Sequence, residues 1–193
     1  MRSLVSTLSM TLLLALPLVA MAAGGGRFTV TSVDFTNGGT IPMAQVFNSF
    51  GCSGGNQSPA LHWSGVPAGT KSFAVTIYDP NAPTGSGWWH WIIYDIPANV
   101  TALPRNAGDP RRRLAPRGSV QTRSDFGTPG YGGPCPPKGD DEHRYMFKVY
   151  ALDVAKLPVK PDSMAIPLHL HFHSLAQAIL TGTYARAGGS YVP

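Results

Sequence analysis

Four side chains whose chemistry is unusual for a protein interior stand at the ends of apolar stretches of the sequence. Asp79 ends the stretch SFAVTIYD, and His90 begins the apolar part of WHWIIYDI. His143 and Tyr145 open a third stretch, HRYMFKVYAL. Side chains two positions apart on a strand share a face, so each polar group should project from the core side of its strand. Charged groups are retained in such places when they are paired or touch a ligand, which predicts one pocket at one end of a β structure.

A carboxylate beside imidazoles has a definite chemical consequence. We expect Asp79 to orient a histidine, here His90, and to raise its pKa, which favours imidazolium. An imidazolium and backbone N–H groups together form an anion site. The glycine-rich segment GYGGPCPPKG, residues 130–139, can supply such N–H groups just ahead of His143. The alternative is that Asp79, His90 and Tyr145 only satisfy one another inside the core.

Period-two alternation predicts the strands that carry these groups. The predicted strands are Arg27–Val33, Ser72–Asp79, Trp89–Ile96, Ser119–Arg123 and His143–Leu152. In the third of them, one face is predicted to hold His90, Ile92, Tyr94 and Ile96, with Trp89, Trp91 and Ile93 on the other.

The segment HSLAQAILTG near the C-terminus predicts a helix. Ser174 can cap it, and Leu175 and Ile179 lie one turn apart. Gly182 follows as a stop signal. We therefore expect a peripheral C-terminal helix.

The composition predicts one β-rich domain. Hydrophobic residues make up 43% of the chain and charged residues only 13%, which favours a compact globule over a disordered chain. The 22 glycines and 18 prolines indicate long, shaped loops. The expected fold is a mainly antiparallel β-sandwich over residues 23–193 with long loops and the peripheral helix.

The first 22 residues read as a Sec-type signal peptide. Arg2 supplies a positive start, residues 12–20 form a short apolar core, and Ala20-Met21-Ala22 is a small-x-small cleavage site. No later apolar run approaches the roughly 20 residues that a spanning helix needs. The expectation is an exported protein, periplasmic or secreted, without a membrane span.

The distribution of charge limits the kinds of partner that the protein can bind. The net charge of +5 comes largely from a cluster of arginines at positions 111, 112, 113, 117 and 123. A nucleic-acid groove would interleave such charges with exposed aromatic residues, and none occur there, so we expect no nucleic-acid partner. The cluster is interpreted as a solvated loop or, less favoured, as a docking surface for an acidic partner.

Export permits a disulfide between Cys52 and Cys135, but the sequence gives no distance between them.

Several long motifs resemble the phosphatidylethanolamine-binding protein family, in particular its bacterial, Raf-kinase-inhibitor-like branch. They are DPNAP from Asp79, WWHW from Trp88, GGPCPP from Gly132, HRYMFKVYAL, CSGGNQSPALHWSGVPAGTKSFAVTIYDP and LHFHSLAQAILTGTYAR. The resemblance spans nearly the whole chain after the signal peptide, with the motifs in the same order.

This resemblance implies a β-sandwich with a small pocket for phosphate-like groups and phospholipid headgroups. The positions that match its pocket motifs are Asp79, Pro83, Trp88, His90, Gly133, Pro134, His143, Tyr145 and, with a weaker match, Tyr184. One departure is Asn81, where the family pattern has a second aspartate. The change removes a negative charge from the rim, which favours anions or weakens a hydrogen bond that shapes the loop.

Two other functions are weighed against this one. GCSGG, residues 51–55, with Asp79 and His90 suggests a hydrolase triad, but Ser53 lacks a nucleophile elbow and a glycine-rich loop explains the motif better. His169, His171 and His173 would share one face of an extended segment and could hold a metal, but the expectation is no metal and no cofactor.

Trp89 and Trp91 bear on whether the protein forms a homodimer. Trp89 and Trp91 are expected to pack between sheets or at an interface, and exposure of both would indicate a homodimer.

The sequence thus predicts an exported, non-enzymatic binding protein for a phosphate-bearing molecule or phospholipid headgroup. His90 and His143 would contact the anion, Asp79 would orient His90, Tyr145 would donate its hydroxyl, and the loop 132–137 would shape the floor. The alternative is a protein-interaction module that inhibits a kinase or a protease.

Overall fold

Two antiparallel sheets lie face to face in the structure, a computed structural model that describes residues 26–188. The smaller sheet has the order β1-β2-β5 and the larger the order β6-β4-β3-β7-β8. The strands are β1 (Thr29–Thr31), β2 (Leu61–Ser64), β3 (Ser72–Asp79), β4 (Trp88–Pro97), β5 (Ala102–Leu103), β6 (Val120–Gln121), β7 (His143–Leu152) and β8 (Ser174–Tyr184). The predicted mainly β, antiparallel sandwich is confirmed. The predicted signal peptide lies outside the described residues.

The main core fills the space between the two sheets. From the larger sheet, Phe73 and Ile77 of β3 and Phe147 of β7 are fully buried, as their alternation predicts. From the smaller sheet, Trp63 of β2 packs edge-on against Phe73, with ring centroids 5.3 Å apart. Because Asp79 and Tyr145 continue the same faces of β3 and β7, these polar groups point to the core side at the strand ends.

Two β-bulges in β4 change the faces predicted for this strand. Ile77 pairs with Trp91 and Tyr78 with Trp89, so His90 is an extra residue between them. A bulge of this kind places two successive side chains on one face. His90 and the fully buried Trp91 therefore both face the main core, whereas the predicted alternation put them on opposite faces.

Trp89 and Trp91 of β4 do not form the exposed pair that would have indicated a homodimer. Trp91 is fully buried, and its indole N–H donates to Gln121 at 2.7 Å. Trp89 is half-buried on the outer face of the sheet, where its ring lies 4.6 Å from that of Tyr78. These two residues therefore give no support to a homodimer.

The predicted C-terminal helix is wrong in position. The helix α1 spans Ile166–Phe172, with a proline in its first turn. Residues 174–184 instead form β8, which pairs with β7 along its length. Ala178 and Leu180 alternate into the core, and Gly182, read as a helix stop, faces Ile41, where an added Cβ would lie 2.5 Å from the side chain.

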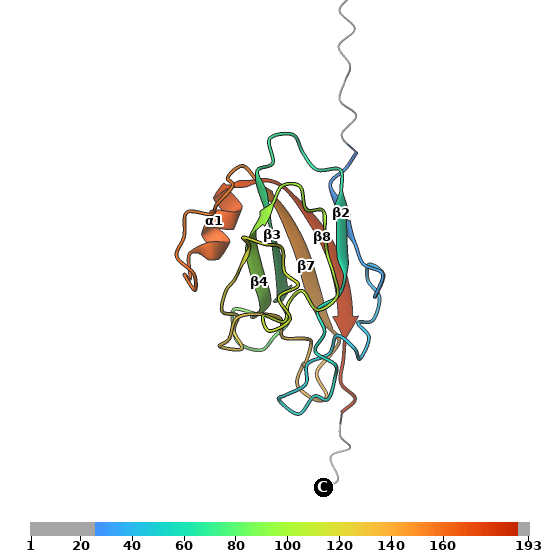
Figure 1. Cartoon of the computed structure of the whole chain (residues 1–193). Helices are drawn as coiled ribbons and strands as arrows, with labels where there is room; N and C mark the ends of the chain where they lie inside the picture. The colour runs from blue at the N-terminus through green and yellow to red at the C-terminus, as the bar shows by residue number, and fades with distance from the viewer. Residues whose placement is uncertain (1–25, 189–193) are drawn as a thin grey trace, which may run out of the picture.

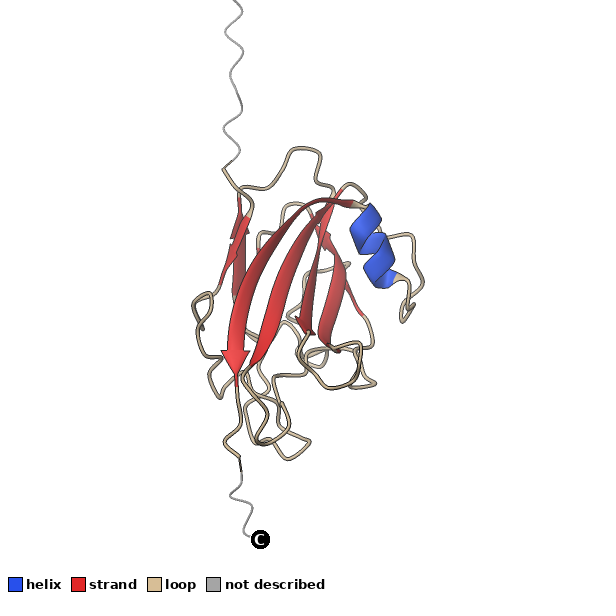
Figure 2. Cartoon of the chain, turned by 180° about the vertical axis from the view of Figure 1, so that it is seen from behind, coloured by secondary structure: helices blue, strands red, loops and turns tan. Residues whose placement is uncertain are grey.

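The helix covers the face of the larger sheet that lies away from the smaller sheet (Figure 1; Figure 2). Its buried residues Ile166 and Leu170 form a second core with Ile92 and Tyr94 of β4. Among residues 26–188 no helix could cross a bilayer, since α1 has seven residues.

The long loops gather at the end of the larger sheet where β8 finishes (Figure 1). There His143, the first residue of β7, pairs with Tyr184, the last residue of β8. Asp79, the last residue of β3, pairs with Trp88, the first residue of β4. The antiparallel order thus brings the polar strand ends together under the loops.

Candidate functional site

A cavity of about 220 Å³ opens at these strand ends. Its lining is Phe50, Asp79, Ala82, Pro83, Thr84, Trp88, His90, Phe126, Cys135, Pro136, Pro137, His143 and Tyr145. Six of the residues predicted from the sequence are among them. The walls are aromatic rings and prolines, and the polar groups come from β3, β4 and β7 at the floor.

Asp79 and His143 form a buried pair on the floor. The His143 ring donates from Nδ1 to the Asp79 carboxylate at 2.7 Å, and both side chains are about 95% buried. The other ring nitrogen, Nε2, lies 3.5 Å from the Asp140 carboxylate. Asp79 therefore orients His143 and not His90, which corrects the predicted pairing.

His90 is held by the backbone of the glycine-rich loop. Its Nδ1 lies 2.8 Å from the Gly132 carbonyl oxygen, which can only accept, so Nδ1 carries the proton. Burial lowers the pKa of His90 to about 4, and the backbone contacts with Gly132 and the Asp79 charge offset this only in part. The imidazolium predicted from the sequence is wrong for this residue: His90 is neutral at pH 7.

Tyr145 carries the most unusual polar atom of the site. Its side chain is fully buried, and within residues 26–188 its hydroxyl has no hydrogen-bond partner of good geometry. Burial, with the charge of Asp79 close by, raises the pKa of Tyr145. The ring stands nearly perpendicular to that of His90, with centroids 5.1 Å apart. An unsatisfied buried hydroxyl at a cavity floor points to a missing partner.

Asn81 keeps the shape of the loop after β3. Its backbone N–H donates to Asp79 at 2.8 Å, and its side-chain oxygen accepts from the Arg144 N–H at 3.1 Å. An aspartate could accept the same bond, so the substitution removes a charge from the rim and leaves this hydrogen bond in place.

Three predicted site residues lie outside the cavity lining. Gly133 allows a close backbone approach, because an added Cβ would lie 2.0 Å from the Gln45 carbonyl oxygen. The Pro134 carbonyl accepts from the Phe47 N–H at 3.0 Å. The Tyr184 hydroxyl contacts the Met43 sulfur at 3.4 Å. These residues support the loops around the cavity.

Sequence reasoning missed the two phenylalanines of the aromatic rim, which also includes Trp88. Phe50 is 65% exposed, and its ring lies 5.7 Å from that of Phe126, which in turn contacts Trp88 and His90. The signal available was a pair of phenylalanines in otherwise polar, glycine-rich loops. A disulfide between Cys52 and Cys135 ties these loops together beside the cavity, with Cα atoms 6.0 Å apart.

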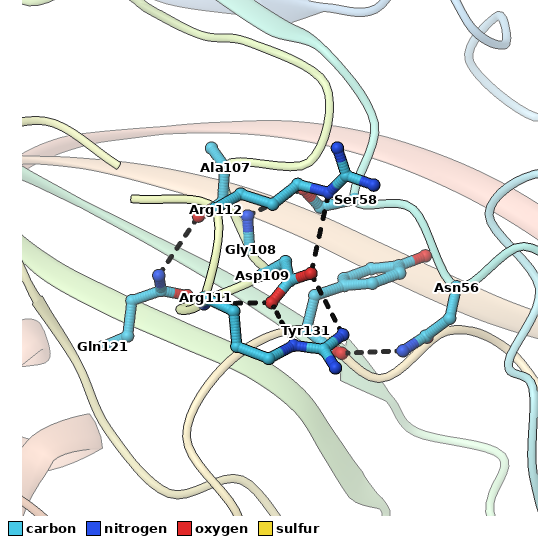
Figure 3. A network of polar contacts seen from close by, with 9 residues as sticks. All are labelled: Asn56, Ser58, Ala107, Gly108, Asp109, Arg111, Arg112, Gln121 and Tyr131. Carbon is cyan, nitrogen blue, oxygen red and sulfur yellow. Dashed lines mark hydrogen bonds and ion pairs between the residues drawn. The ribbon is translucent and has the colours of Figure 1, made fainter. Parts of the chain in front are cut away.

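A polar network fixes the segment that holds His90 (Figure 3). Asn56 donates to the Tyr131 carbonyl at 3.3 Å and accepts from the Gly133 N–H at 2.8 Å. The Tyr131 N–H donates to the Gly108 carbonyl at 2.9 Å, and the Gly108 N–H donates to the Ser58 hydroxyl at 2.9 Å. Residues 131–133 are thus held from two sides, which keeps the carbonyl that binds His90 in place.

The same network anchors the base of the loop with Arg111, Arg112 and Arg113, here called the arginine loop. Arg111 donates from Nε and a terminal nitrogen to the Asp109 carboxylate at 3.0 and 3.2 Å, and this contact lowers the pKa of Asp109. Arg112 lies 3.7 Å from the same carboxylate (Figure 3). A polar cavity of about 290 Å³ adjoins these residues. The loop is anchored at its base, while its arginines are exposed.

The geometry disfavours the two competing readings of the site. Ser53 is exposed in its loop, and the bonds of His90 and Asp79 go to Gly132 and His143. His169 and His171 lie on α1, so the three histidines do not form the extended face considered above. Across residues 26–188, no three His, Cys, Asp or Glu side chains gather as metal ligands.

Comparison with known proteins connects this geometry to a family. The model of the phosphatidylethanolamine-binding protein family matches residues 31–185. Escherichia coli YbcL is 50% identical over 171 residues, which cover 88% of this chain and 93% of YbcL, and E. coli YbhB is 47% identical over 80% of this chain and 98% of YbhB. The crystal structure of E. coli YbcL superposes with a TM-score of 0.80 at 52% identity, covering 83% of this chain and 99% of YbcL. The chain belongs to the phosphatidylethanolamine-binding protein family.

Proposed function

We propose that the protein is an exported, non-enzymatic binding protein whose floor of Asp79, His90, His143 and Tyr145 takes a phosphate-bearing small molecule or a phospholipid headgroup. The observation that carries the proposal is the buried hydroxyl of Tyr145, a residue that lines the cavity; within residues 26–188 this hydroxyl has no hydrogen-bond partner of good geometry. A ligand oxygen that accepts from this hydroxyl would satisfy it. Family membership supports a binding protein as the general class.

The absence of an activated nucleophile supports a non-enzymatic role. Of the lining residues, Thr84 donates its hydroxyl to the Gly87 carbonyl at 2.5 Å, and Cys135 is in the disulfide. The raised pKa of Tyr145 makes this hydroxyl a poor nucleophile. His90 does have a free Nε2, but none of these groups donates to it.

Calorimetric titration tests the proposal. The protein without its first 22 residues is titrated with inorganic phosphate and phosphoethanolamine between about pH 5.5 and 7.5, around the ordinary histidine pKa of about 6.5. We expect saturable one-to-one binding that His90→Ala and His143→Ala abolish. Arg113→Gln, an exposed change outside the lining, is the matched control and should bind like the wild type. No heat of binding for the wild type at any pH would reject the proposal.

A protein-interaction role is the second candidate, and the arginine loop favours it. Arg111, Arg112 and Arg113 are exposed on a loop whose base is hydrogen-bonded to the domain, so they present a fixed basic surface. Glutamate at all three positions should abolish inhibition of an acidic-surfaced kinase or protease and leave phosphate binding unchanged. The opposite result would assign function to the pocket alone.

Export rests on the N-terminal sequence. Expression of the full chain in a bacterium, followed by osmotic shock, should release a product whose N-terminus is at or near Ala23. A product that stays inside the cell with Met1 intact would remove export from the proposal.

A further inference from the structure

The protonation of His90 determines what the cavity can recognise. The ring is 96% buried, and its Nδ1 proton is committed to the Gly132 carbonyl at 2.8 Å. Because the ring is neutral, Nε2 carries a lone pair and no proton. His90 therefore presents an acceptor on its free side.

The other charged groups of the floor are already committed. One oxygen of Asp79 accepts from the Asn81 N–H at 2.8 Å, and the other accepts from His143 at 2.7 Å. The two nitrogens of His143 face Asp79 and Asp140. Among the polar side chains of the described floor, the Tyr145 hydroxyl, which lies close to Asp79 but has no hydrogen bond of good geometry, is left as a donor and His90 as an acceptor.

The aromatic rim raises the free-energy cost of leaving Nε2 of His90 without a hydrogen-bond donor. Phe50, Trp88 and Phe126 stand over the floor and limit the water that could re-solvate Nε2 after a ligand enters. A bound oxygen without a hydrogen would face this lone pair directly. A buried polar group left unpaired in this way penalises the wrong ligand strongly.

We propose that the ligand must donate a hydrogen bond to Nε2 of His90, so that the cavity selects phosphate species carrying a P–O–H group or a nearby ammonium and rejects oxyanions without a proton. Tyr145 donates to a ligand oxygen while the ligand donates to His90. This inference rests on the proposed function and makes His90 the residue that sets its specificity. Inorganic phosphate, which keeps a proton at pH 7, fits; sulfate, similar in shape and charge, does not.

The decisive experiment compares inorganic phosphate with sulfate at pH 7 by calorimetry. The wild type should bind phosphate at least about tenfold more tightly than sulfate, the size of one lost hydrogen bond at a buried site. His90→Gln can turn its amide N–H₂ toward the ligand, so its phosphate-to-sulfate ratio should fall to about one. His143→Gln is the matched control: it should weaken both anions and keep the ratio. Thermal unfolding verifies that both variants fold.

Two phosphodiesters distinguish a free phosphate from a lipid headgroup. Dimethyl phosphate has no hydrogen to donate and should not bind. Glycerophosphoethanolamine carries an ammonium, so its binding would identify a lipid headgroup as the ligand. If the protein binds inorganic phosphate but not glycerophosphoethanolamine, the ligand is a free phosphate. Sulfate or dimethyl phosphate binding as tightly as phosphate would overturn the inference and leave the proposed function standing. Absence of binding for every probe would reject both.

Discussion

Replacing Tyr145 with phenylalanine removes one buried oxygen atom from the cavity floor and nothing else. The hydroxyl has no hydrogen-bond partner of good geometry in the described part of the chain, and burying such a group costs about 1–3 kcal/mol. The cavity beside it, about 220 Å³, has room for water, so we take the low end of that range. Tyr145→Phe should therefore stabilise the unliganded protein by about 1 kcal/mol, which raises Tm by about 2–4 °C for a domain of this size.

The same change should weaken ligand binding, since the hydroxyl is the donor that the ligand uses. We expect a loss of about tenfold in affinity for phosphate. Urea denaturation measures the stability, and calorimetric titration measures the affinity.

Tyr131→Phe is the matched control for the stability. Tyr131 is also buried, but its hydroxyl donates to the Gln45 carbonyl at 2.8 Å. Its loss should destabilise the protein by about 1 kcal/mol. The reasoning is refuted if Tyr145→Phe destabilises the protein as much as Tyr131→Phe does, or if it leaves phosphate affinity unchanged.

Three further predictions follow from the contacts of the site. Asp79→Asn replaces the charge-assisted bond to His143 with at most a neutral one and should lower the free energy of unfolding by about 1–2 kcal/mol in urea denaturation; an unchanged value would contradict the pairing. Serine at both Cys52 and Cys135 should cost about 2–4 kcal/mol because the bond closes a long loop, and two titratable thiols in denatured, unreduced wild type would show that the bond is absent. The folded pKa of His90 is about 4 and its unfolded pKa about 6.5, so the free energy of unfolding should be highest above about pH 6.5, fall by up to about 3 kcal/mol as the pH drops toward 4, and level off below. His90→Gln should lose this pH dependence, and an equal slope in both proteins would refute the assignment.

The polar groups of the cavity floor could be predicted because the strand ends are marked in the sequence. Asp79, His90 and His143 each interrupt an apolar face at the end of a strand, and antiparallel neighbours bring such ends together. The aromatic rim could not be predicted in the same way. Phe50 and Phe126 lie in loops whose course depends on distant contacts, including the disulfide and the Asn56 network.

The pairing within the pocket could not be predicted because it depends on a bulge. Simple alternation places His90 and Trp91 on opposite faces, whereas the extra residue in β4 turns both toward the core. His90 then meets the Gly132 carbonyl, and Asp79 meets His143 from the strand on its other side. Bulges have no reliable signal in a single sequence, so the carboxylate's partner is decided by the register of three strands.

The C-terminal error has a different physical origin. Ser174, Leu175 and Ile179 satisfy the local rules for a helix, but Ala178 and Leu180 also alternate with a period of two. Pairing with β7 along nearly the whole segment outweighs a local preference of less than about 1 kcal/mol per residue. Local propensity is the weaker term where a long neighbouring strand offers an unpaired edge.

Two opposing effects set the charge of His90, and the sequence alone does not show which of them is larger. A nearby carboxylate raises a histidine pKa by about 1–3 units, while full burial lowers it by up to about 3–5. Asp79 gives its close contact to His143, so for His90 burial prevails and the pKa falls to about 4. A site expected to bind anions through an imidazolium at His90 thus has a neutral acceptor at that position. A ligand that fits this floor must bring a hydrogen of its own, and the comparison of phosphate with sulfate measures that requirement directly.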